Sequence, residues 1–112
     1  MLRIAVCAVI TTSLTGCMAD QAAKDAATKA YADCTMTAVK RLDDGRSDPS
    51  SIAMGVSGAC AGQYAQLSDQ MIHTMFTEGG QASMKDRMEA NELRLATTAV
   101  LKFRAAQRDQ QR

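Results

Sequence analysis

Apolar residues recur every three or four positions along this chain, and no stretch alternates between apolar and polar residues for long. That period is typical of α-helices that bury one face. We therefore predict an all-α protein, with amphipathic helices over about residues 20–44, 49–77 and 83–107.

The junction between the first two helices carries clear boundary residues. Gly45 can adopt the left-handed conformation that ends many helices. Asp48 fits the N-cap of the second helix, and Pro49 fits its first position, where a missing N–H has no cost. These residues predict a short loop of ordinary length between two antiparallel helices.

The apolar stripes of these two helices predict how they pair. In an antiparallel pair the numbers of facing residues add up to a constant. The sum of the two residue numbers is 94 for Leu42 with Ile52, Ala38 with Val56 and Cys34 with Cys60, and 95 for Tyr31 with Tyr64. We expect a helical hairpin with both cysteines at one level. Small residues of the second helix are expected to let the helices approach closely there, namely Gly55, Gly58, Ala59 and Gly62; the alternative is a frayed helix.

The third helix is expected to be long and amphipathic. The sequence Glu78-Gly79-Gly80 predicts the end of the helix before it, and Ser83 with Asp86 resembles a capping box. Its predicted apolar stripe comprises Met84, Met88, Leu95, Ala99 and Phe103, widened by Leu93, Val100 and Leu101. This helix could fold back on the hairpin, or project and offer its stripe to a partner. Its basic end holds Lys102, Arg104, Arg108 and Arg112, expected as a frayed tail that is solvated or contacts membrane or cell wall.

The first residues, MLRIAVCAVITTSLTG, have the order of a secretory signal: a basic start, an apolar stretch too short to span a bilayer, and a small-residue end. Leu14-Thr15-Gly16-Cys17 resembles the lipobox of bacterial lipoproteins. The resemblance implies cleavage before Cys17 and fatty acyl chains such as palmitate on that residue, which anchor the chain in membrane lipid. The alternative is a buried N-terminal helix with Cys7 and Cys17 as core thiols.

The resemblance also implies a domain organisation and an address. Residues 1–16 would be the signal peptide, 17–24 a lipid-anchored linker and 25–112 a periplasmic helical domain. Met18 stands where enteric lipoproteins of the inner membrane carry Asp, which favours the outer membrane. Of the four cysteines, Cys34 and Cys60 then remain, and in an oxidising periplasm such a pair is expected to form a disulfide; a reduced buried pair or a metal site is the alternative.

Charge and motifs carry little further chemistry. The formal net charge is +1, so no bulk field favours nucleic acid. Met71 and Met75 flank the single histidine, His73, and methionines can bind Cu(I), but core packing is their commoner use. The neighbouring acids Asp43 and Asp44 are expected to cap a helix end rather than form a catalytic pair. We expect no enzyme and no cofactor.

The sequence thus favours a disulfide-stapled hairpin with a long third helix, in a lipoprotein with a protein-interaction or accessory role and an envelope protein as its possible partner. The alternatives are a structural or stress-related envelope protein that acts through the basic C-terminal helix, and metal binding through methionines.

Overall fold

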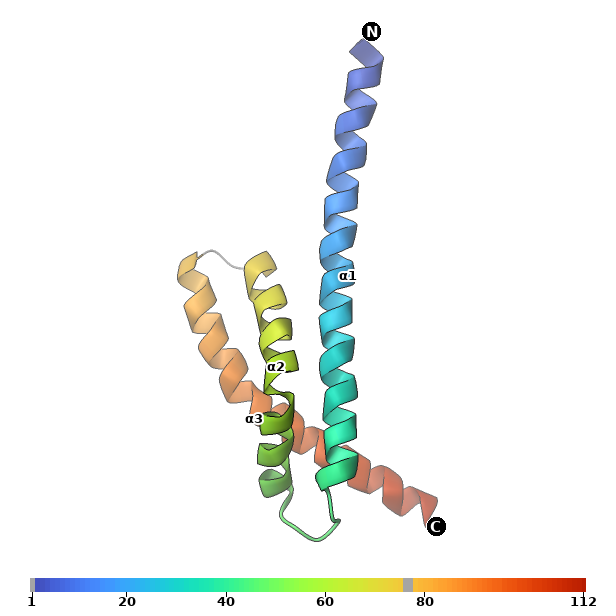
Figure 1. Cartoon of the computed structure of the whole chain (residues 1–112), viewed down its shortest axis with the longest axis vertical. Coiled ribbons are helices and arrows are strands. Elements are labelled where there is room, and N and C mark those ends of the chain that lie inside the picture. Colours follow the sequence, from blue (N-terminus) through green and yellow to red (C-terminus); the bar gives the residue numbers. More distant parts are fainter. Residues whose placement is uncertain (1, 76–77) are drawn as a thin grey trace.

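The computed structural model describes the backbone of residues 2–75 and 78–112 and the side chains of residues 18–73 and 79–112. It consists of three helices: α1 (Leu2–Leu42), α2 (Pro49–Met75) and α3 (Glu78–Gln110). Helices α1 and α2 run antiparallel beside each other, and α3 starts along α2 and then crosses behind the hairpin (Figure 1). The predicted fold class is confirmed, and the third helix packs on its own hairpin.

The core is thin and made of small side chains. Its largest fully buried members are Val39, Val56, Cys60 and Val100; Ala38, Ala53 and Ala96 belong to the same cluster, and Tyr64 and Ile72 are buried as well. Helices approach closely where their facing residues are small, so valine and alanine fill most of this core. Leu93, Leu95 and Leu101 are all exposed by two fifths or more.

The hairpin loop follows the prediction. Gly45 has a φ of 71°, the left-handed conformation that only glycine adopts without strain. The Asp48 carboxylate accepts hydrogen bonds from the backbone N–H groups of Ser50 and Ser51, at 3.0 and 3.2 Å. The N-cap at Asp48 and the helix start at Pro49 are therefore confirmed.

The predicted start of the third helix was wrong. Helix α3 begins at Glu78, so Gly79 and Gly80 lie in its first turn and Ser83 lies inside the helix rather than at a cap. Glycine lowers helix stability but does not exclude a helix. The N-terminal part of α3 packs along α2 (Figure 1), and Met84 and Met88 are half-buried there.

The expected role of the glycines was correct at one position only. A β-carbon on Gly55 would lie 3.3 Å from Cδ1 of Leu42, so this glycine does serve the close approach of α1 and α2. Gly58 and Gly62 have no such neighbour within 4 Å and are exposed. Nothing in the packing explains these two glycines.

Residues 18–24, expected as a linker, continue α1 as helix with largely exposed side chains. Within the part of the chain whose side chains are described, no helix has an apolar stretch long enough to cross a bilayer.

Candidate functional site: a groove beside the α1–α3 crossing

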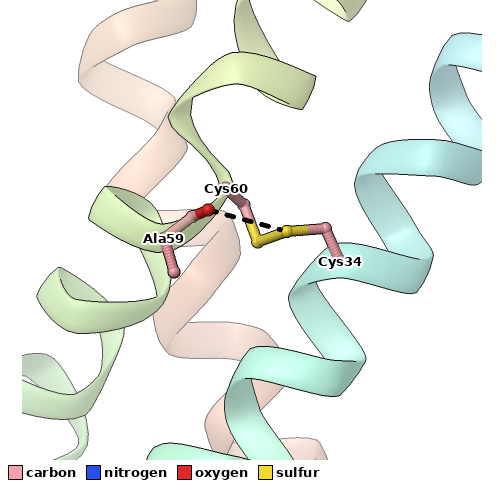
Figure 2. The surroundings of a disulfide bond; sticks show 3 residues. All are labelled: Cys34, Ala59 and Cys60. Atoms are coloured by element: carbon pink, nitrogen blue, oxygen red, sulfur yellow. Dashed lines mark hydrogen bonds between the residues drawn. A yellow bond between two sulfur atoms is a disulfide. The ribbon is translucent and has the colours of Figure 1, made fainter.

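A disulfide joins α1 to α2 at the level that the stripes predicted. Cys34 and Cys60 are bonded with their Cα atoms 5.9 Å apart, and the Cys34 sulfur lies 3.9 Å from the carbonyl oxygen of Ala59 (Figure 2). One turn away, the rings of Tyr31 and Tyr64 are 5.1 Å apart between centroids and tilted by 57°. Both contacts confirm the predicted register. Cys60 is fully buried and Cys34 half-buried, so the bridge fixes the hairpin from inside.

A polar layer lies next to the tyrosines, where α3 packs on α2. The Tyr64 hydroxyl donates a hydrogen bond to the backbone oxygen of Met88, and the Ser68 hydroxyl lies 3.6 Å from the Met88 sulfur. Glu92 of α3 enters the same layer, and its Oε1 is buried without a hydrogen-bond partner among the described residues. Burial, followed by the nearby charge of Glu92, raises the pKa of Tyr64 to about 12.

Replacing Glu92 with Met is expected to stabilise the protein. A buried polar atom without a partner costs about 1–3 kcal/mol, and Met fills a similar volume with equal helix propensity. The free energy of unfolding in urea should rise by about 1 kcal/mol. Because the Glu92 charge contributes to the raised pKa of Tyr64, an absorbance titration should show Tyr64 ionising at lower pH in this variant. A loss of stability would mean that the carboxylate has a stabilising partner.

The acids of the α1–α2 loop accept hydrogen bonds from its backbone N–H groups. Asp44 Oδ1 accepts hydrogen bonds from the N–H groups of Arg46 and Ser47, at 2.9 and 2.7 Å, and its Oδ2 accepts one from the Ser47 hydroxyl at 2.6 Å. These bonds, led by that from the Ser47 side chain, lower the pKa of Asp44. The pKa of Asp48 is lowered chiefly by the hydroxyl of Ser50. Asp44 and Asp48 thus have structural roles, as the sequence predicted for both.

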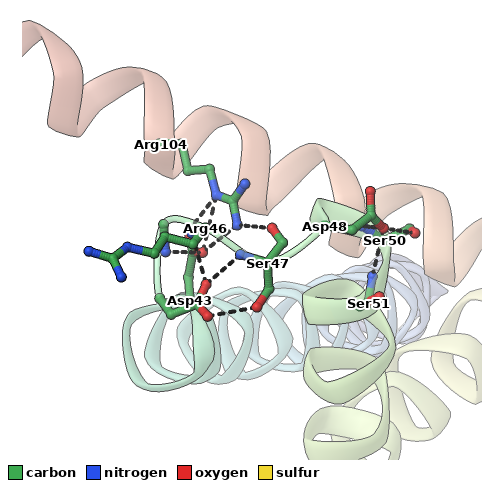
Figure 3. Close-up of polar contacts among 9 residues, drawn as sticks. Asp43, Arg46, Ser47, Asp48, Ser50, Ser51 and Arg104 are labelled. Atoms are coloured by element: carbon green, nitrogen blue, oxygen red, sulfur yellow. Dashed lines mark hydrogen bonds and ion pairs between the residues drawn. The ribbon is translucent and has the colours of Figure 1, made fainter.

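Arg104 of α3 ties the crossing helix to this loop. Its Nε and Nη2 both bind the Asp43 carboxylate, at 3.1 and 2.7 Å, and Nη2 also donates to the backbone oxygen of Ser47 at 2.7 Å (Figure 3). The side chain of Asp43 is 1% exposed and that of Arg104 17%. The guanidinium lowers the pKa of Asp43. The prediction that Arg104 belongs to a frayed tail was therefore wrong: it forms a part-buried, bidentate ion pair.

An apolar groove of about 380 Å³ opens between α1 and α3. Its lining comprises Met36 from α1 and Leu95, Thr98, Ala99, Lys102, Phe103 and Ala106 from α3. Met36 is 44% and Leu95 45% exposed, whereas Ala99 and Phe103 reach into the core. The sequence assigned Leu95 to the packed face, but the neighbouring Ala96 is the buried residue. Leu95 instead forms one wall of an open apolar surface.

The other predicted site residues lie away from this groove. The backbone at Cys17 is part of α1, but its side chain lies outside the described residues, so its acylation stays a prediction. His73 is exposed and Met71 is 36% exposed, while the side chain of Met75 is not among those described. Within residues 18–73 and 79–112 no three His, Cys, Asp or Glu side chains are grouped as metal ligands would be.

Comparison with known proteins gives no relative: no family model, no curated protein and no solved structure matches this chain.

Proposed function

We propose that this chain is a lipid-anchored protein of the bacterial envelope whose helical domain binds another envelope protein and catalyses no reaction. The observation that carries the proposal is the open apolar groove of Met36, Leu95 and Phe103 on a domain whose helices are joined by a disulfide and an ion pair. Exposed apolar surface that is continuous and rimmed by polar residues marks interaction sites.

The envelope location rests on the sequence. The signal-like first sixteen residues and the lipobox-like Leu14–Cys17 favour export and acylation at Cys17, more readily to the outer membrane than to the inner. The disulfide is in keeping with that compartment, since such bonds persist where the surroundings are oxidising.

Two measurements test the partner and the anchor of this proposal. The first uses a photo-cross-linking amino acid at Leu95, introduced into the full chain in its native host. We expect it to link one envelope protein in stoichiometric yield. The matched control is the same amino acid at Met54, an exposed apolar residue of α2 outside the groove, which should link none. The mass of the purified membrane-bound form should show acylation on Cys17 and loss of residues 1–16. An unacylated chain that retains Met1 would contradict the anchor, and equal yields at both positions would contradict the groove.

The alternative of a wall- or lipid-binding basic tail can be separated in the same cells. Arg104 is committed to Asp43 and Lys102 lines the groove, so the exposed Arg108 and Arg112 are the basic residues of the tail that can be changed without touching either. Changing these two to Gln should leave cross-linking at Leu95 unchanged if the groove carries the function. Loss of cross-linking would favour the tail.

A further inference from the structure

The two cysteines of the disulfide differ in their access from solvent. Cys60 has no exposed surface, and it belongs to the buried cluster that also contains Ala96 and Val100 of α3. Cys34, on α1, is only half-buried (Figure 2). The described side chains therefore cover the bridge at Cys60 and leave it accessible at Cys34.

A hollow of about 400 Å³ leads to Cys34 from the open side of the hairpin. Cys34 lines this hollow and Cys60 does not; the other lining residues are Ala30, Asp33, Thr37, Ala38, Arg41, Ala59 and Gln63. The lining residues one turn before and after Cys34 on α1 are both alanines, so no long side chain there covers the sulfur. The two charged lining residues have opposite signs, and Asp33 is already paired with Lys29, so the hollow does not repel a thiolate.

We propose that Cys34 is the site at which a dithiol reductant attacks the bridge while the domain stays folded. One thiolate of the dithiol bonds to Sγ of Cys34, the bond between the two Sγ atoms breaks, and its electron pair leaves with Sγ of Cys60, which takes a proton from water. The second thiolate of the dithiol then attacks the first dithiol sulfur and releases Cys34 as a thiolate, which is protonated in turn. The dithiol is oxidised to a disulfide, and the bridge is reduced to two thiols.

Other contacts still hold α3 in place when the bridge is open. Arg104 binds Asp43 and the backbone oxygen of Ser47, and the Tyr64 hydroxyl of α2 donates to the backbone oxygen of Met88 in α3. Reduction thus removes the covalent link between α1 and α2 without detaching α3. The redox state of the bridge would control how firmly α1 is held on α2, and neither the partner nor the anchor proposed above is needed for this reaction.

The rate at which the folded protein is reduced tests this site. The full chain with Cys7 and Cys17 changed to Ala contains only the bridged cysteines. It is treated with dithiothreitol at several urea concentrations below its unfolding transition, and thiols are counted by alkylation and mass spectrometry. We expect a rate that is proportional to the dithiol concentration and nearly independent of urea, because attack on the folded state exposes little new surface. A rate that rises with urea as steeply as global unfolding does would overturn the proposal.

A larger side chain over Cys34 tests the entrance. Helical side chains lean toward the N-terminus of their helix, so the exposed Thr37, three residues on, lies over Cys34. Thr37→Phe, which changes helix propensity little, should slow reduction at least about fivefold, or about 1 kcal/mol in activation free energy. The matched control is Thr28→Phe, at an exposed threonine of α1 outside the hollow, which should leave the rate unchanged. Equal rates in the two variants would contradict an entrance through the hollow.

Single-cysteine variants of the same chain identify the sulfur. Cys60→Ala leaves Cys34 as a free thiol, and Cys34→Ala leaves Cys60. We expect Cys34 to react with an aromatic disulfide reagent at least about tenfold faster than Cys60, since Cys60 reacts only after a local opening and tenfold corresponds to only about 1.4 kcal/mol. A rate at Cys34 that is no faster than that at Cys60 would overturn the assignment. Circular dichroism checks that both variants fold; if one does not, the urea dependence and Thr37→Phe decide.

Discussion

Removing the disulfide, by changing Cys34 and Cys60 together to Ala, is expected to lower the free energy of unfolding by about 3.5 kcal/mol. The bridge closes a loop over a sequence separation of 26 residues, and the chain-entropy model assigns that amount to such a loop. Alanine is preferred to serine because Cys60 is fully buried and a hydroxyl there would add a separate cost. Small domains have about 5–15 kcal/mol in total, so this change removes a large share.

Urea unfolding of residues 17–112, followed by circular dichroism, measures the effect. The unchanged protein treated with reductant is the matched control, and its midpoint should move close to that of the double variant. If oxidised and reduced protein unfold at the same urea concentration, the bridge does not stabilise the hairpin, and the register that it fixes in α1 and α2 would be in doubt.

Replacing Arg104 with Met is expected to lower the melting temperature by roughly 10 °C. The Asp43 carboxylate, 1% exposed, would keep its burial and lose its cation, which is the costly way to break an ion pair. Arg108, one turn further and exposed, is the control: Arg108→Met should change the melting temperature little.

The pH dependence of this loss of stability shows whether the broken ion pair causes it. Because Arg104 holds the pKa of Asp43 below its usual value of 3.8, the pair stabilises the fold above that pH and stops doing so as the pH falls through the lowered pKa. The difference between the Arg104→Met variant and the unchanged protein should therefore be full at pH 7 and shrink below about pH 4. A difference that is constant with pH would assign the effect to lost packing of the arginine stem instead.

The hairpin could be predicted because several independent signals constrain one register. The stripes of α1 and α2, the two cysteines and the tyrosine pair all require the same alignment, and Gly45 and Asp48 fix the loop between them. A shift by one residue would have separated Cys34 from Cys60.

The third helix could not be predicted in the same detail. Its apolar residues surround much of its circumference, so Leu93, Leu95 and Leu101 compete with the small Ala96 for the packed face. Close packing selects the alanine, which hydrophobicity alone does not reveal. The partner of Arg104 lies 61 residues away in sequence, and no local pattern indicates such a pair. The groove depends on the burial of Ala96 in place of Leu95 and on the way α3 crosses α1. Neither could be predicted, so the groove was visible only in the structure.

The position of the disulfide also has a mechanical meaning. If the domain is anchored at Cys17 and holds a partner at the groove, as proposed, a pull between the two enters through α1, where Met36 lies two residues beyond Cys34. The 25 residues between the bridged cysteines could otherwise release roughly 85 Å of extended chain under tension. The covalent bridge keeps that length stored whatever happens to the surrounding helices. A tethered domain built in this way would lengthen less under tension than the same domain without the bridge.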